Sequence, residues 1–163
     1  HWINIVGVAG KKSQADYVKA SASYAMVSIA LFDAFVSCWD EKYRSLLVRP
    51  ETVINEQIDP EWLPMLQTPP FPEYTSGHSV ASSAASVVLT SIYGDKFAYD
   101  DDTEVEFGLP VRKFTSFDQA AAEASISRLY GGIHYRSAIE NGITQGKSIG
   151  SLVVNKIKLK GNK

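Results

Sequence analysis

The sequence of 163 residues has a single cysteine, no excess of basic residues and no internal repeat. Because one cysteine cannot form an internal disulfide, Cys38 excludes a disulfide framework and leaves the redox compartment undecided. Lysine and arginine number 16 against 18 acidic residues, giving a formal net charge of −2, so the composition gives no indication of nucleic acid as a partner. What is left is the composition of an ordinary domain, long enough to bury a real core.

Long apolar runs are also scarce. Residues 21–39 carry one charge, Asp33, and approach the length of a membrane span. A central carboxylate and several serines would be costly in hydrocarbon, so we predict a buried helix and no membrane span. The chain begins at His1 and not at methionine. We therefore expect a single catalytic domain over residues 1–163 that follows a missing N-terminal portion, and a signal peptide cannot be judged from it.

Helical periodicity is what the sequence has in abundance. Spacings of three and four residues predict one long amphipathic helix from Ser13 to Leu47, which Arg49-Pro50 would end. The face predicted to pack into the core consists of Tyr17, Ser21, Tyr24, Ser28, Leu31, Phe35 and Cys38.

Shorter elements are expected around this helix. Residues 1–10, which include two glycines, would form a lead-in loop or the end of a missing element, and residues 95–114 a small hairpin or an irregular loop. Further helices are predicted at 60–66, at 77–93 with Ser76 as N-cap, from the capping box at Ser116 to the break at Gly131-Gly132, and at 137–158. Together these elements predict an all-α helical bundle.

The stretch from Pro69 to Ser86 is the most distinctive in the chain. Its prolines predict an extended approach, and Thr75 and Ser76 are good N-cap residues before a run of small helical residues. A helix N-terminus offers free N–H groups and the positive end of the macrodipole to an anion. Gly77 lets the backbone approach a ligand, and His78 can move a proton near neutral pH. Taken alone, these residues also fit an ordinary capped helix.

Two more pairs of residues add to this stretch. Lys42 and Arg49 are seven positions apart, so a continuous helix would place both on one face, about 10.5 Å apart along its axis. A solvated basic helix end is the alternative for this pair. Arg128 and His134 are six positions apart, directly after Ser127. The three motifs in chain order are Lys42-x6-Arg49-Pro50, Ser76-Gly77-His78 and Ser127-Arg128-x5-His134.

In this order and with these spacings, the motifs resemble the superfamily of type 2 phosphatidic acid phosphatases, bacterial class A acid phosphatases and vanadium-dependent haloperoxidases. The resemblance covers residues 42–134. The stretches Pro-Phe-Pro-Glu-Tyr and Gly-Gly-Ile-His-Tyr-Arg are most similar to the bacterial haloperoxidase branch. The resemblance implies a helical fold in which this chain is the C-terminal catalytic half, and a periplasmic or secreted location. It leaves a homodimer open.

The resemblance also implies an oxyanion site. Lys42, Arg49 and Arg128 would neutralise the oxyanion, with the two guanidinium groups able to bind its oxygens in bidentate fashion. Ser76 and the Gly77 amide would complete the cradle. The oxyanion would be vanadate as a cofactor, or phosphate in the same place.

Two histidines would carry the chemistry that the resemblance implies. His134 would bind vanadate through its imidazole in a haloperoxidase, or become phosphohistidine in a phosphatase, and His78 would be the general acid and base. The family often has an aspartate four residues after the apical histidine, to orient it, and here that position is Ala138. Glu140 is close in the sequence but lies off that helical face. Candidates to replace the aspartate in orienting His134 are therefore Glu140 and a backbone carbonyl.

Three functions follow from these motifs. The leading hypothesis is a vanadium-dependent haloperoxidase that oxidises halide with hydrogen peroxide. The alternatives are an acid phosphatase that hydrolyses phosphomonoesters through phosphohistidine, and a helical oxyanion-binding module without catalysis. Partners would be these small molecules and the missing N-terminal portion of the same protein. We expect exposed apolar surface where that portion would cover the chain.

Overall fold

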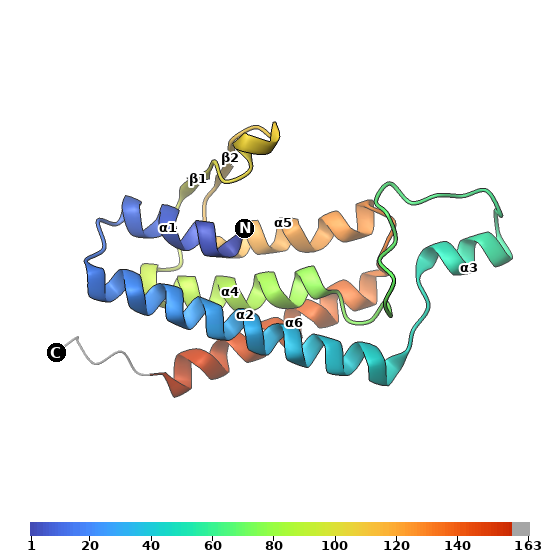
Figure 1. Ribbon diagram of the computed structural model, residues 1–163, viewed down its shortest axis with the longest axis horizontal. Coiled ribbons are helices and arrows are strands. Elements are labelled where there is room, and N and C mark those ends of the chain that lie inside the picture. Colours follow the sequence, from blue (N-terminus) through green and yellow to red (C-terminus); the bar gives the residue numbers. More distant parts are fainter. Residues whose placement is uncertain (158–163) are drawn as a thin grey trace.

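The computed structural model describes residues 1–157, in which six α-helices and one two-stranded hairpin are present. Helices α2 (Tyr17–Ser45), α4 (Gly77–Tyr93), α5 (Phe117–Tyr130) and α6 (Arg136–Lys156) run alongside one another, and α4 contacts the other three (Figure 1). The predicted all-α bundle is confirmed. The predicted end of the last helix, Lys158, lies outside the described residues.

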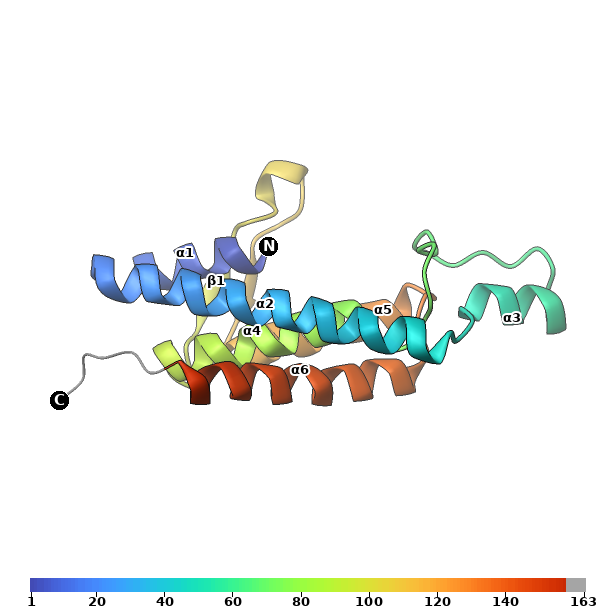
Figure 2. The same ribbon diagram turned by 60° about the horizontal axis from the view of Figure 1, so that its bottom comes forward.

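Helix α4 is central because its small side chains let neighbouring helices approach closely. Glycines of α6 recur every four residues along the face that meets α4, at Gly142, Gly146 and Gly150. A Cβ at Gly146 would overlap the Val80 carbonyl and lie 2.9 Å from Ser83 Cβ. The two helices therefore pack almost backbone to backbone, as the second view also shows (Figure 2).

The prediction of a loop over residues 1–10 is wrong, because the chain forms helix α1 (Trp2–Lys12) there. Its buried face consists of Trp2, Ile5, Val6 and Ala9, which recur at helical spacing. Glycine at position 7 leaves room for Tyr24, because a Cβ there would lie only 2.9 Å from the Tyr24 hydroxyl. Close packing on α2 thus outweighs the low helix propensity of glycine.

The long helix α2 is confirmed, but most of its predicted core face is wrong. Cys38 is buried and Leu31 packs half-buried against the core, whereas the other five predicted residues are exposed. Asp16 caps its N-terminus by accepting a hydrogen bond from Lys19 N at 2.7 Å. Tyr17 is 93% exposed. The buried face is rotated from the predicted one and consists of Ser23, Met26, Val27, Ala30, Ala34, Cys38 and Lys42. Small side chains there fit against α4 better than the aromatic residues do.

The opposite side of α2 is apolar and exposed, as expected for surface that another portion would cover. Its exposed members include Ile29, Phe32, Val36 and Tyr43. By length and composition alone, the stretch Tyr17–Gln57 could cross a membrane, since 18 of its residues have a mean hydropathy of 1.4. Core helices of soluble proteins pass the same test, and 33% of that window is buried. The structure buries only one face of the helix predicted as buried.

Helix α2 ends at Ser45, two residues before the predicted end at Leu47, and Arg49-Pro50 does not set its end. Leu46 has a left-handed backbone, φ 51°, that stops the helix, and Pro50 instead begins helix α3 (Pro50–Gln57). The short helix predicted at 60–66 is absent from the described chain, where these residues form turns and bends. Helix α3 and the following loop extend away from one end of the bundle (Figures 1 and 2).

A hairpin connects α4 to α5, one of the two alternatives left open for residues 95–114. Strands β1 (Tyr99–Asp101) and β2 (Arg112–Phe114) pair antiparallel, with Tyr99 opposite Phe114. Between the two strands, the chain contains the 3₁₀ turn η1 (Val105–Phe107). Ser116 caps α5 through Gln119 N, as the capping box predicted. The hairpin rises beside α1 (Figure 1).

Candidate oxyanion site

A proline-rich loop, residues 69–76, folds over the C-terminal end of α2 and is held there by Lys42. This side chain is fully buried. Its Nζ donates to three backbone carbonyls, those of Pro72 at 2.9 Å, Glu73 at 2.9 Å and Thr75 at 2.6 Å. An ammonium group has three N–H donors, so all of them are engaged. Burial lowers the pKa of Lys42 to about 8, an effect that the neighbouring Arg49 reinforces.

Arg49 supports the same loop from its other side. Its Nε donates to Phe71 O at 3.1 Å and one terminal nitrogen donates to Pro72 O at 3.3 Å. The other terminal nitrogen lies 2.7 Å from Ile133 O and 3.1 Å from His134 Nε2. The helix break between Lys42 and Arg49 removes the predicted common helix face, yet both cations converge on the Pro72 carbonyl.

Ser76 caps α4, and the loop before it is bonded to two other helices. Ser76 Oγ accepts from Ser79 N at 3.4 Å, and Ser76 N donates to Ala138 O at 3.0 Å. Thr75 Oγ1 donates to Gln145 Oε1 at 2.6 Å. Beneath them, the Cys38 thiol lies 3.5 Å from Thr75 O. Tertiary contacts thus fix the N-terminus of α4.

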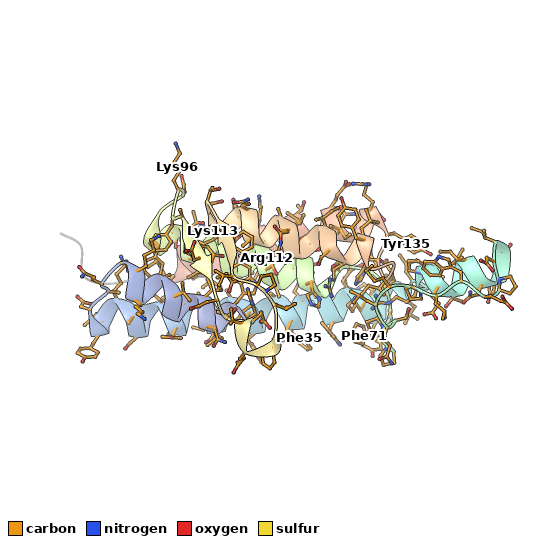
Figure 3. The ribbon with its side chains drawn as sticks, turned by 90° about the horizontal axis from the view of Figure 1, so that it is seen from above. Phe35, Phe71, Lys96, Arg112, Lys113 and Tyr135 are labelled. Atoms are coloured by element: carbon orange, nitrogen blue, oxygen red, sulfur yellow. The ribbon has the colours of Figure 1, made fainter. Side chains whose placement is uncertain are left out.

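Gly77 is needed for close packing on an aromatic side chain. A Cβ at this position would lie 3.3 Å from the ring of Trp39. Trp39 stacks on Phe35, with ring centroids 3.8 Å apart, and lies 5.1 Å from the Phe71 ring. These three rings come from α2 and from the loop before α4 (Figure 3, where Phe35 and Phe71 are labelled). They form one apolar wall beside the N-terminus of α4.

His134 is buried between a carboxylate and a guanidinium group. Its Nδ1 lies 2.7 Å from Glu73 Oε1, opposite the Arg49 contact at Nε2. The same Glu73 oxygen accepts from Tyr135 N at 3.0 Å. Burial lowers the pKa of His134, and the hydrogen bond with Glu73 opposes that effect. Glu140, a candidate partner from the sequence, is exposed on α6.

Glu73 was missed as a site residue by the sequence analysis. Its side chain is fully buried, although glutamate is rarely buried in proteins, and 61 positions separate it from His134. The available signal was a lone carboxylate within an apolar proline-rich stretch, which needs a charged or hydrogen-bonding partner if it is buried.

A cavity of about 990 Å³ opens beside this wall and joins part of the predicted site. Gly77, His78, Arg128 and His134 all line it, together with Phe35, Trp39 and Phe71. Lys42, Arg49 and Ser76 are buried behind the lining. The structure therefore brings the predicted residues to one place but divides them into a lining group and a supporting group.

His78 lies at the exposed surface of the cavity. The surrounding protein lowers its pKa to about 4, and the positive charge of Arg128 and the His134 ring act in the same direction. Burial also lowers the pKa of Arg128, whose Nε donates to Ser127 Oγ at 3.1 Å. His78 is therefore neutral at pH 7, beside a guanidinium cation.

The donor set fits an oxyanion better than a metal cation. The site contains three cations, two histidines and the amides at the start of α4, and the Oε1 of its one carboxylate, Glu73, is already engaged by His134 and Tyr135. Within residues 1–157, no group of three or more histidine, cysteine or acidic side chains has the arrangement of a metal site. Such a cluster attracts an anion that can accept several charge-assisted hydrogen bonds.

Comparison with known families decides what this arrangement belongs to. Residues 55–162 match the model of the VCPO second helical-bundle domain. The chain belongs to this family. The match includes Gly77, His78, Arg128 and His134, whereas Lys42 and Arg49 lie before it.

Solved structures agree with membership of the VCPO second helical-bundle domain family. A bacterial vanadium-dependent iodoperoxidase is 63% identical with a TM-score of 0.95, and the alignment covers 97% of this chain and 38% of that one. A holo-type bacterial vanadium-dependent chloroperoxidase is 20% identical with a TM-score of 0.77, covering 94% and 40% of the respective chains. Its apo-type counterpart is 21% identical with a TM-score of 0.66, covering 80% and 35%. No curated protein matches the sequence.

These coverages bear on what the family membership means. The chain spans 38% of the length of the iodoperoxidase. The likeness to the chloroperoxidases, at 20% and 21% identity, shows the same fold. The predicted relation to vanadium-dependent haloperoxidases is confirmed.

Proposed function

We propose that the protein is a vanadium-dependent haloperoxidase that oxidises iodide with hydrogen peroxide. The observation that carries this proposal is the 63% identity to a vanadium-dependent iodoperoxidase over 97% of the chain. The cavity lined by His78, Arg128 and His134 supports it. Chloride or bromide as the halide is an outcome of the test below.

Vanadate fits the donor set of this site. His134 would ligate it through Nε2, Arg128 would bind its oxygens from the cavity wall, and the Gly77 amide would bind from the start of α4. When bound, vanadate supplies a Lewis-acid centre that activates hydrogen peroxide toward the halide. Ser76 and Arg49 complete the predicted set, Ser76 through its hydroxyl hydrogen, whereas Lys42, whose three N–H donors are engaged by loop carbonyls, would contribute its positive charge.

Arg49 has a specific task in admitting a ligand to His134. The Nε2 atom has one lone pair, and the guanidinium of Arg49 now donates to it at 3.1 Å. For Nε2 to hold a ligand, Arg49 would have to give up this contact, and its N–H would then be free to donate to an oxyanion oxygen.

His78 handles the proton. With its pKa lowered to about 4, the ring is neutral at pH 7 and can accept a proton from peroxide at an imidazole nitrogen. A bound oxyanion contributes negative charge next to the ring, which stabilises the imidazolium and raises the pKa again. The aromatic wall of Phe35, Trp39 and Phe71 keeps water from one side of the cavity.

Acid phosphatase activity is the alternative from the sequence, and the comparisons do not favour it. The solved neighbours described above are haloperoxidases. The expected periplasmic or secreted location and the N-terminal portion of the same protein as a partner stay predictions.

The test is halide oxidation by the vanadate-loaded full-length protein, with iodide, bromide and chloride compared in turn. We expect peroxide-dependent iodide oxidation that vanadate restores after its removal and that phosphate suppresses by competition. Hydrolysis of p-nitrophenyl phosphate is measured alongside. Steady hydrolysis that vanadate inhibits, without oxidation of any halide, would replace this proposal by the phosphatase alternative.

A further inference from the structure

The two neighbours of His134 determine which of its ring nitrogens carries the proton. A guanidinium group can only donate hydrogen bonds, so the Arg49 contact at 3.1 Å requires Nε2 to be the acceptor. The hydrogen of the neutral ring is then on Nδ1, where it is donated to Glu73 Oε1 at 2.7 Å. The two contacts together select the tautomer with Nδ1 protonated, and Glu73 is the group that accepts the Nδ1 hydrogen.

Glu73 is itself held firmly in place. Its backbone carbonyl accepts from Lys42 Nζ at 2.9 Å and its backbone N donates to Leu47 O at 2.9 Å. The side-chain Oε1 also accepts from Tyr135 N, next to His134 in the chain. With 0% exposure, the carboxylate has no competing water on this side. It can therefore fix both the position and the rotation of the imidazole ring.

We propose that Glu73 is the positioning residue of His134, which holds the ring in the Nδ1–H tautomer and so keeps the Nε2 lone pair for the oxyanion. This inference rests on the proposed function, because it names the residue that prepares the ligand of that site. It also accounts for Ala138, since the carboxylate expected four residues after His134 is supplied from the loop before α4. Ala138 is buried, and its carbonyl is engaged by Ser76 N.

The tautomer is measured directly by ¹⁵N NMR of the histidine rings in the full-length protein, with His134 identified from the signal that His134→Gln removes. We expect Nδ1 protonated and Nε2 unprotonated in the unsubstituted protein without oxyanion. Observation of the Nε2–H tautomer there would overturn the proposal without any variant of Glu73.

Variants separate positioning from support of the fold. Glu73→Leu removes the acceptor, so signal from the Nε2–H tautomer should appear. Glu73→Gln has a carbonyl that can still accept from Nδ1, and should retain the original tautomer. Glu140→Gln, which changes the exposed carboxylate considered as a substitute from the sequence, is the matched control for Glu73→Gln and should change nothing. An unaltered tautomer in a folded Glu73→Leu would contradict the proposal.

Binding gives a readout that does not depend on turnover. Titration calorimetry with orthovanadate should show an affinity loss of about 10- to 100-fold in Glu73→Leu, the usual effect of losing a partner of a ligating histidine. Phosphate, held by the cations without a bond to Nε2, should lose less. Equal losses for both anions would indicate a structural role alone. If the unsubstituted protein binds no orthovanadate, the proposed function fails while the tautomer still decides this inference.

Discussion

Arg128 and Arg44 offer a direct comparison between a guanidinium in the cavity wall and one on the surface. Arg44 is exposed and pairs with Asp40 one helical turn earlier, whereas Arg128 lines the cavity. A charge-assisted hydrogen bond contributes about 1.5–3 kcal/mol, so Arg128→Ala should weaken phosphate and orthovanadate binding by about 10- to 100-fold. Arg44→Ala should leave both affinities unchanged in the same titration. Equal losses would show that Arg128 is not part of the oxyanion site.

His78 should titrate well below an ordinary histidine. The NMR midpoint of its ring in the protein without oxyanion is expected near pH 4. Between pH 6.5 and about 4 the unfolded chain takes up a proton at this site that the folded chain does not, so the free energy of unfolding falls as pH drops through that window. Arg128→Ala should raise the midpoint, because a nearby positive charge is removed, whereas Arg128→Lys should not. A midpoint near 6.5 would contradict the assigned surroundings.

The residues of the site were predictable to different degrees. Short motifs with recognisable internal spacing predicted His78, Arg128 and His134, and all three line one cavity. Lys42 and Arg49 were expected to face the oxyanion directly, but they bond to loop carbonyls. That arrangement follows from the left-handed backbone at Leu46. Leucine rarely adopts this conformation, so the sequence could not predict it.

At the scale of helices, the close contact between α4 and α6 should respond to a single methyl group. Gly146→Ala places a Cβ against backbone of α4 that cannot move independently. We expect a loss of about 1–3 kcal/mol in the free energy of unfolding, measured by urea denaturation. Gly10→Ala in α1 is the control, because the nearest atom to its Cβ would be the Tyr93 hydroxyl at 3.7 Å. A neutral Gly146→Ala would mean that the two helices can separate without cost.

The loop before α4 depends on the ammonium group of Lys42. Lys42→Met keeps the length of the side chain but removes three buried hydrogen bonds. Pro72 O keeps its contact with Arg49 and Thr75 O its contact with Cys38, so Glu73 O loses its donor outright. The free energy of unfolding should fall by about 3 kcal/mol, since a buried unsatisfied group costs about 1–3 kcal/mol and two further hydrogen bonds are lost. Lys147→Met, on the exposed side of α6, should be neutral in the same denaturation series. Similar stability in both variants would show that the loop is held by other contacts.

Helix positions were easier to predict than helix faces. Caps at Ser76 and Ser116 and the glycine breaks gave correct ends, because capping is a local effect. Most of the core face of α2 was predicted wrongly, because the sequence analysis assigned aromatic residues to the core. The buried face of α2 consists mainly of small residues. Helix α1 was missed for a related reason, close packing of small residues. Residues 1–10 were expected to form a loop, but Gly7 lies in a helix and makes room for Tyr24.

At the scale of the whole molecule, helix α2 has one buried face and one exposed apolar face. The small residues of α2 pack on α4, while Phe32, Val36 and Tyr43 on its other side are exposed. An apolar surface of this kind is typical of a contact with another protein portion. Its existence was predicted from the sequence, but its location was not, because the prediction assigned the aromatic residues to the core.

Cys38 gives this arrangement a practical use. It is the one thiol among the 163 residues, it is buried beneath the Thr75 carbonyl, and burial raises its pKa. A thiol reagent can reach it only when the loop lifts away from α2. The labelling rate of Cys38 should therefore report the rate of loop opening. We expect slower labelling when an oxyanion is bound at the site and faster labelling in Lys42→Met. Labelling at the same rate with and without phosphate would mean that the loop opens independently of the site.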